Sequence, residues 1–123
     1  MKYVGIDWAS KCWFAVILGQ NKRPEPEFYP TIFHLWYHQH DADRILVDIP
    51  IGLQSDRKRA CDVEAKQVLG STRGNSVFYT PTRKGVEAQN IKEAKQAQDA
   101  LDFSVQNQAW AIVPRIQEVD EFL

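Results

Sequence analysis

The sequence predicts an α/β fold built on a mixed sheet. Two short runs of mainly apolar residues, Lys2–Asp7 and Arg44–Ile49, each carry an aspartate at or near their end. A helical pattern lies between them, and a strand-helix-strand crossover makes two strands parallel neighbours. A third apolar run, Cys12–Leu18, follows the first after a short connection and should pair with it as an antiparallel hairpin.

The first half of the chain supplies the sheet. The run Cys12–Leu18 is apolar on both faces, as expected of a buried strand. The stretch Arg23–Pro30 holds three prolines and can form only an edge strand or a loop. Thr31–His40 predicts a short helix, because Thr31 is a suitable N-cap and apolar residues follow at helical spacing.

The second half is predicted to be helical. Asp56 is a suitable N-cap for the first of these helices and Gly70 a suitable stop. Pro114 removes one N–H from the last helix and should kink or split it. The expected helices are Asp56–Leu69, Val86–Leu101 and Ser104–Leu123, and Ser71–Arg83 is expected to be a loop held by Val77, Phe78 and Tyr79.

The length and charge of the chain restrict the classes of function. A chain of 123 residues fits one domain, which we expect to span residues 1–123. With 15 basic and 16 acidic residues the net charge is −1, so there is no overall charge favouring nucleic acid or a membrane. No signal peptide or apolar run of about 20 residues is present, and the two cysteines fit no metal-ligand spacing. We therefore expect a cytoplasmic protein without membrane contact.

Asp7 and Asp48 are the main candidates for chemistry. Parallel strands end at the same edge of a sheet, so both aspartates should project from the edge where open α/β sheets bind ligands. Two close carboxylates repel each other unless one takes a proton or a cation sits between them. Mg²⁺ suits such oxygen ligands. A role for each aspartate as a cap of the loop that follows it is an equally weighted alternative.

Basic, acidic and histidine side chains elsewhere form weaker candidate groups. Arginines beyond the second strand would suit phosphate oxygens, although a solvated helix face with pairs such as Asp62–Lys66 explains most of that charge. On a regular C-terminal helix only one of two nearby acids can face the aspartates. His34 and His38 stand at a spacing that zinc could use, but a third ligand is lacking. The arginines are Arg59, Arg73, Arg83 and Arg115, and the C-terminal acids are Glu118 and Asp120.

An ordered set of short motifs gives the chain a family resemblance. The set comprises Gly5-Ile6-Asp7-Trp8-Ala9, Asp48-Ile49-Pro50-Ile51-Gly52-Leu53, Arg59-x-Cys61-Asp62 with Leu69-Gly70, Ser76-Val77-Phe78 with Pro81-x-Arg83, and Ile116-x-Glu118-Val119-Asp120. Together these motifs resemble domain-of-unknown-function family four hundred and twenty-nine. Its members are described as predicted nucleases of the ribonuclease H-like fold.

The resemblance implies a mixed sheet with flanking helices and a divalent-metal-dependent nuclease acting on nucleic acid. It implies Mg²⁺ or Mn²⁺ as cofactor. Asp7, Asp48 and Glu118 would be the catalytic residues, and Asp120 would join them as a metal ligand. For such a site, the arginines Arg59, Arg73, Arg83 and Arg115 are the candidate contacts with substrate phosphate. Family members continue into further strands and a helix with another acid. We therefore expect this chain to represent the N-terminal portion of the pattern and, if the chain is complete, to form a homo-oligomer, a dimer, that covers the exposed elements.

Two other classes of function stay open. A non-catalytic binding or assembly module of the same fold fits the near-neutral charge. A nucleotide-dependent phosphotransferase of the actin and sugar-kinase type shares the strand-end aspartate, but the turn Trp8-Ala9-Ser10-Lys11 contains none of the glycines that let backbone amides approach phosphate.

Overall fold

The computed structural model describes residues 1–21 and 23–123 and divides into two compact units. The sheet unit contains residues 1–49 together with residues 118–123, and the helical unit contains residues 50–117. The expectation of one domain over residues 1–123 stays a prediction. Among the described residues no helix is both long and apolar enough to cross a bilayer.

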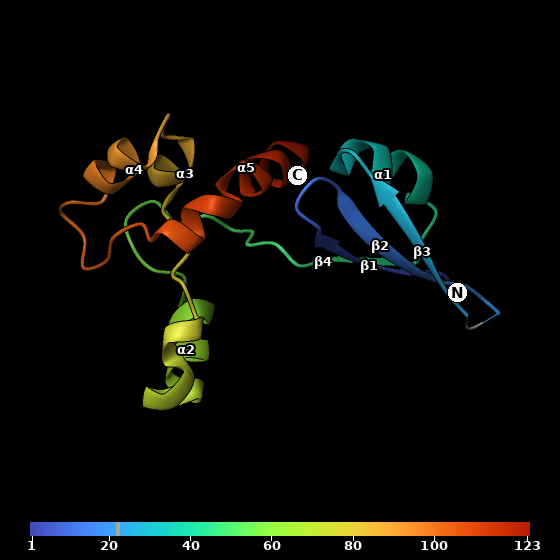
Figure 1. Cartoon of the computed structure of the whole chain (residues 1–123), viewed down its shortest axis with the longest axis horizontal. Coiled ribbons are helices and arrows are strands. Elements are labelled where there is room, and N and C mark those ends of the chain that lie inside the picture. Colours follow the sequence, from blue (N-terminus) through green and yellow to red (C-terminus); the bar gives the residue numbers. More distant parts are fainter. Residues whose placement is uncertain (22) are drawn as a thin grey trace. The chain divides into compact units, whose positions relative to one another are not determined.

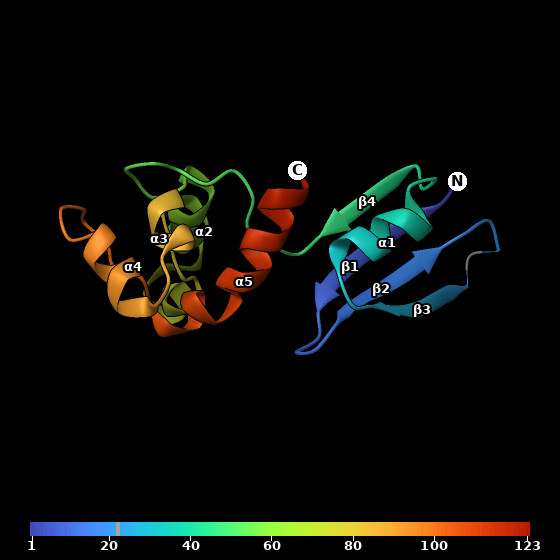
Figure 2. The same cartoon turned by 90° about the horizontal axis from the view of Figure 1, so that it is seen from above.

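The sheet unit is built on a mixed four-stranded sheet, and the chain is an α/β protein (Figures 1 and 2). The strand order is β3-β2-β1-β4. β1 pairs antiparallel with β2 and parallel with β4, and β2 pairs antiparallel with β3. The predicted hairpin, the parallel pair and the proline-rich edge strand are therefore confirmed. The strands are β1 Tyr3–Trp8, β2 Trp13–Leu18, β3 Pro24–Tyr29 and β4 Arg44–Val47.

Helix α1, Ile32–Gln39, covers one face of this sheet (Figure 1). It begins as predicted, because the Thr31 hydroxyl accepts a hydrogen bond of 3.1 Å from the His34 amide. We call the face under α1 the inner face. The buried core beneath the helix contains alternate residues of β1 and β2, the last residue of β3, two α1 residues and one residue of the last helix, namely Val4, Ile6, Trp13, Ala15, Ile17, Tyr29, Ile32, Leu35 and Val119.

The opposite, outer face of the sheet carries the residues that alternate with this core. Several of them are large and apolar but exposed: Phe28 is 64 % exposed and Leu46 is 66 % exposed. The Phe14 and Phe28 rings pack together on neighbouring strands with centroids 5.2 Å apart. The outer-face residues are Tyr3, Gly5 and Asp7 on β1, Phe14, Val16 and Leu18 on β2, Pro24, Pro26 and Phe28 on β3, and Arg44 and Leu46 on β4, followed by Asp48.

The helical unit differs from the prediction at three places: the start of α2, the predicted loop Ser71–Arg83, which contains the end of α2 and the turn η1, and the predicted helix Val86–Leu101. Helix α2 begins at Ala60, four residues later than expected, and Asp56 does not cap it. Its N-cap is Arg59, which stays extended because its guanidinium binds Asp62 in the first turn. Gly70 has a φ of 63° and kinks the helix, as a helix-stopping glycine does, but the helical assignment continues to Arg73. The elements of this unit are α2 Ala60–Arg73, the 3₁₀ turn η1 Gly74–Ser76, α3 Arg83–Glu87, α4 Ile91–Ala97 and most of α5 Asn107–Phe122.

The predicted helix Val86–Leu101 is wrong, because the structure has α3 and α4 there with a break between them. Asn90 starts α4, since its side chain accepts a hydrogen bond of 2.9 Å from the Glu93 amide. An asparagine competes well for the helix cap and poorly for a helix interior. The final helix is not split, since α5 runs through Pro114.

Gln98 organises the interior of the helical unit. Its Oε1 accepts a hydrogen bond of 2.9 Å from the Thr82 amide, and its Nε2 donates one of 3.2 Å to the Phe103 carbonyl. These bonds tie α3, α4 and the following loop together, because a buried amide must be satisfied by such partners. The buried apolar residues of this unit are Val86, Ala94, Phe103, Val105, Ala109, Val113 and Ile116.

Candidate functional site

Asp7 and Asp48 are neighbours on the outer face of the sheet. The parallel register pairs Ile6 with Val47, and the Asp48 amide continues that pairing by donating a hydrogen bond of 2.8 Å to the Ile6 carbonyl. The next residues on the two strands are the two aspartates. Adjacent strands lie about 4.8 Å apart, and residues in register project from the same face. Both aspartates are exposed.

Most oxygens of the two carboxylates are available to a ligand. One oxygen of Asp7 accepts a hydrogen bond of 2.7 Å from the Trp8 amide. Within residues 1–21 and 23–123, the Asp48 carboxylate accepts no hydrogen bond. Gly5 precedes Asp7 on the same face, and a Cβ built there would meet nothing within 4 Å. The pair therefore faces open space rather than a packed neighbour.

Two like charges in register are unfavourable for the sheet itself. At about 5 Å their repulsion is about 1 kcal/mol in water and larger near a protein surface, and like charges on adjacent strands destabilise pairing. A divalent cation between the carboxylates would reverse the sign of this interaction. One or two carboxylates with several waters are sufficient to hold Mg²⁺.

Glu118 belongs to the sheet unit, but its carboxylate lies toward the inner face. Its Oε1 accepts a hydrogen bond of 2.9 Å from the Trp13 indole and one of 2.6 Å from the Ile32 amide, the first of α1. The amides of a helix start need such acceptors. Glu118 thus connects the end of α5 to the buried Trp13 and the start of α1, whereas Asp7 and Asp48 project from the other face.

The four carboxylates of the predicted site are not assembled into one cluster. Asp120 is half-buried on α5, two residues beyond Glu118 and therefore not on the same side of the helix. In the part of the chain that the structure describes, no group of three or more histidine, cysteine, aspartate or glutamate side chains could hold a metal ion. What the structure brings together is the pair Asp7 and Asp48.

Arg59 lies in the helical unit and forms a part-buried ion pair with Asp62. Its guanidinium donates to both carboxylate oxygens of Asp62, at 2.6 and 3.2 Å, and also to the Ile51 carbonyl at 2.8 Å. Asp62 is only 8 % exposed and also accepts a hydrogen bond of 2.9 Å from the Thr80 amide. Burial alone would raise the pKa of Asp62, but the bonds from Arg59 and Thr80 outweigh burial and hold that pKa below its usual range.

The remaining predicted phosphate contacts also belong to the helical unit. Arg83 lies 3.9 Å from the Glu87 carboxylate across one turn of α3, and both side chains are exposed. Arg73 is exposed at the end of α2, and Arg115 is half-buried on α5. Contact of these arginines with phosphate stays a prediction.

The two candidate histidines each contact a neighbouring side chain. His34 Nδ1 lies 2.8 Å from the Thr31 hydroxyl, and the His38 ring packs on Tyr29 with centroids 5.7 Å apart.

Sequence reasoning missed a polar pocket in the helical unit that Lys66 and Lys95 line. No local pattern indicates this pocket, because the two lysines stand on different helices, α2 and α4.

Comparison with known proteins agrees with the motifs that carry Asp7 and Asp48. Residues 5–123 match the family described as "Protein of unknown function (DUF429)". No curated protein and no solved structure matches the chain. Because the match covers nearly all of the sequence, the chain belongs to the DUF429 family.

Proposed function

We propose that this chain is a divalent-metal-dependent nuclease of the ribonuclease H-like fold. The observation that supports the proposal is the in-register placement of Asp7 and Asp48 on one exposed face, where the first strand meets its parallel partner. The mixed sheet, with β1 antiparallel to β2 and parallel to β4, is of the kind that the family resemblance implies. The fold gives the class of reaction by analogy only, so the two carboxylates carry the proposal.

The carboxylate pair fits Mg²⁺ or Mn²⁺. Both ions prefer oxygen ligands, and the three oxygens of Asp7 and Asp48 that accept no hydrogen bond among the described residues are of that type. A bound ion would polarise a phosphodiester and lower the pKa of a water molecule. Asp7 and Asp48 would hold the ion, and the sheet would fix their separation through its register.

The protein contributes a rigid and open site. The Trp8 amide orients the Asp7 carboxylate through its hydrogen bond, and the backbone bond between Asp48 and Ile6 fixes the other strand. The open space at Gly5 leaves room for a phosphodiester beside the carboxylates. These residues position the reacting groups in advance, which is the main contribution a protein makes to metal-assisted hydrolysis.

Metal binding is the first test. Titration calorimetry with Mn²⁺ should show binding by the wild type and a loss of about tenfold or more in Asp7→Asn and Asp48→Asn, since even outer partners of a metal site are worth about 10–100-fold. Glu121→Gln is a matched control, because Glu121 is an exposed acid of the sheet unit and the charge change is the same. Equal binding by all four proteins would contradict the site.

Stability without metal separates a metal site from a structural cap. In EDTA, Asp48→Asn should be at least as stable as the wild type, because it removes repulsion of about 1 kcal/mol, and the Asp48 carboxylate accepts no hydrogen bond among the described residues that the substitution could weaken. A structural carboxylate would instead make the variant less stable. Cleavage of single- and double-stranded DNA and RNA in Mn²⁺, abolished by EDTA and by either substitution, would establish the reaction.

A non-catalytic assembly module is the second candidate. The exposure of Phe28 and Leu46 on the outer face favours it, because contiguous apolar surface commonly marks an interaction site. A second copy of the chain would then cover this face. Sedimentation analysis should show a dimer that Leu46→Lys dissociates, and no cleavage of any nucleic acid would accompany it. A monomer at high concentration would exclude this candidate.

A further inference from the structure

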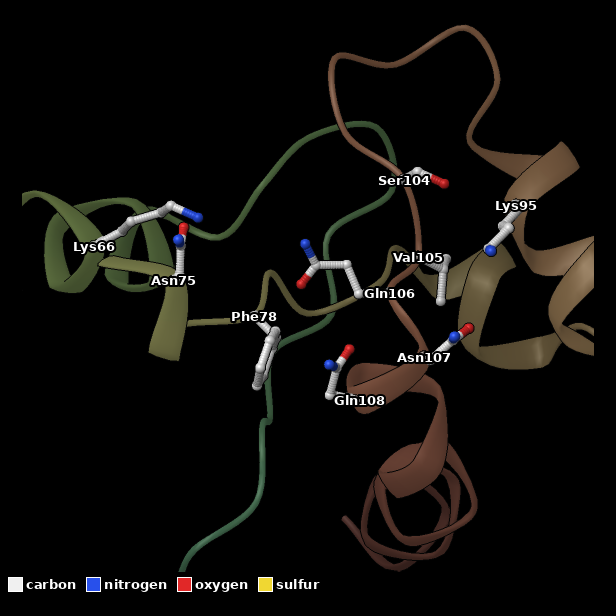
Figure 3. Close-up of a pocket in the computed structure, with 9 residues that line it drawn as sticks. All are labelled: Lys66, Asn75, Phe78, Lys95, Ser104, Val105, Gln106, Asn107 and Gln108. Atoms are coloured by element: carbon white, nitrogen blue, oxygen red, sulfur yellow. The ribbon is translucent and has the colours of Figure 1, made fainter. Parts of the chain in front are cut away.

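The helical unit contains a polar pocket of about 530 Å³ that has no part in the proposed metal site of Asp7 and Asp48 (Figure 3). Its volume lies within the range of about 300–1,000 Å³ typical of sites for small ligands. α2, η1, α4, the start of α5 and the segments beside them supply the walls. The lining residues are Lys66, Asn75, Phe78, Lys95, Ser104, Val105, Gln106, Asn107 and Gln108.

The pocket has a positive charge in a chain whose net charge is −1. Lys66 and Lys95 line it, and none of its lining residues is acidic. Across the described ranges 1–21 and 23–123, no carboxylate lies within 4.0 Å of either ammonium group. Asp62, one turn before Lys66, is bound to Arg59 instead. The two charges are therefore not neutralised by the protein.

Lys66 is held in position rather than extended freely into solvent. Its Nζ lies 4.9 Å from the centre of the Tyr79 ring, within the range of a cation–π contact. Its stem passes Gly74 so closely that a Cβ there would lie 3.4 Å from Lys66 Cγ. Lys58 lies over the same ring at 4.6 Å but is neutralised by Asp102 at 3.1 Å. Of these two lysines, Lys66 is the one that lines the pocket.

The beginning of α5 adds donors to the same pocket. Asn107 and Gln108 belong to the first turn of this 16-residue helix, and that turn contains no acidic residue. The N–H groups of a first turn carry partial positive charge and bind anions readily. Figure 3 shows Lys66 and Lys95 on opposite sides of the pocket, with the Gln106 amide between them. The amide side chains supply further hydrogen-bond donors.

Phe78 gives the pocket an aromatic surface, since its side chain lines the pocket and is 38 % exposed. Flat aromatic rings stack with bases, and adjacent lysines bind the phosphates that bases carry. We propose that this pocket binds a nucleoside phosphate unit, with Lys66 and Lys95 on the phosphate and Phe78 against the base. The unit comes either from a free nucleotide or from a single strand. The proposal does not depend on the aspartate pair in the sheet unit.

Binding without metal tests the pocket separately from the proposed nuclease. In EDTA, AMP is titrated by calorimetry and a fluorescein-labelled eight-residue oligo-dT by anisotropy. Lys66→Gln/Lys95→Gln should weaken binding by about tenfold or more, because both phosphate contacts are lost. For the oligonucleotide, the slope of log K against log salt should become shallower by about 1.4, which is two contacts at about 0.7 each.

The chain offers a closely matched control. Lys84→Gln/Lys92→Gln removes the same charge from exposed lysines of α3 and α4, and Lys92 stands one turn from Lys95. This control should bind within about twofold of the wild type, and Lys66→Arg/Lys95→Arg should retain binding, since phosphate contact needs the charge. Phe78→Leu should weaken AMP binding by about fivefold or more, because stacking of the base on the ring is lost, and should not affect the binding of inorganic phosphate.

The outcomes separate the two ligand sources and can overturn the proposal. Tight AMP binding identifies a free nucleotide, and binding of the oligonucleotide without AMP identifies a single strand. If Lys66→Gln/Lys95→Gln and Lys84→Gln/Lys92→Gln lose the same amount of binding, the ligand responds to overall positive charge and not to this pocket, and the proposal is overturned. The absence of any binding by the wild type would overturn it as well. Lys95→Gln alone keeps the test valid if the double variant unfolds, because Lys95 is exposed on α4.

Discussion

Substitution of Glu118 by glutamine distinguishes a structural role from a metal-binding one. Its carboxylate Oε1 accepts hydrogen bonds from the Trp13 indole at 2.9 Å and the Ile32 amide at 2.6 Å. A hydrogen bond to a charged group contributes about 1.5–3 kcal/mol, against about 1 kcal/mol for a neutral one. Glutamine retains an oxygen but loses the charge, so each bond should weaken by about 1 kcal/mol.

The position of Glu118 at the start of α1 adds a smaller term. A negative charge at a helix N-terminus contributes about 0.3–1 kcal/mol. The expected loss for Glu118→Gln is therefore about 2–3 kcal/mol in the free energy of unfolding. This is a large share of the about 5–15 kcal/mol that holds a domain folded. Urea denaturation followed by circular dichroism, in EDTA, measures it directly.

Glu121→Gln on the same helix controls for the change in net charge. Glu121 is exposed, so its substitution should alter stability by no more than about 0.5 kcal/mol. Calorimetry with Mn²⁺ supplies the second measurement, in which Glu118→Gln should bind as the wild type does. Unchanged stability together with lost Mn²⁺ binding would refute the structural assignment and make Glu118 a metal ligand, as its place in the family motif predicts.

Three further substitutions test contacts within the helical unit. Asp62→Asn should cost about 3 kcal/mol at pH 7, because it leaves a buried guanidinium without its counter-charge. Folding lowers the pKa of Asp62, so the wild type keeps this stability above about pH 4 and loses it as the pH falls through the folded-state pKa. In urea melts, Asp62→Asn should therefore lack this acid-dependent loss of stability. Asp102→Asn, which changes an exposed ion pair, should retain it. Gly85→Ala should cost about 1–3 kcal/mol by thermal unfolding, because its Cβ would lie 2.7 Å from the buried Gln98 Oε1. Asn90→Ala should cost about 1 kcal/mol through loss of the α4 cap, and an unchanged melting temperature would contradict that role.

The sheet unit was predictable because its signals are local. β1 and β2 are apolar runs with a short turn between them, and Thr31 caps α1 through the amide three residues ahead. The parallel pairing of β4 follows from the crossover alone. In each case, neighbours in the sequence decide the structure, so the pattern of residue types contains the information.

The helical unit was less predictable because its decisive contacts are distant in sequence. The start of α2 depends on Arg59 and Asp62, and the Asp62 position is fixed in turn by the Thr80 amide, 18 residues later. The charged pocket forms only because Lys66 and Lys95, which stand on different helices, line the same cavity. Asn90 is a different case: its capping preference was readable in the sequence, but the Gln- and Ala-rich pattern around it favoured one continuous helix.

The register of β1 and β4 makes the aspartate pair a consequence of the core. Val4 and Ile6 are buried on the inner face, and Ile45 and Val47 pack against the same core. A slip of one residue would turn one strand's apolar set toward solvent, which a half-buried sheet does not tolerate. The core therefore fixes two like charges side by side, at a cost of about 1 kcal/mol that a neutral residue at either position would avoid. Violations of local preference that the rest of a fold enforces are expected at functional sites, and a cation is the simplest ligand that turns this repulsion into binding energy.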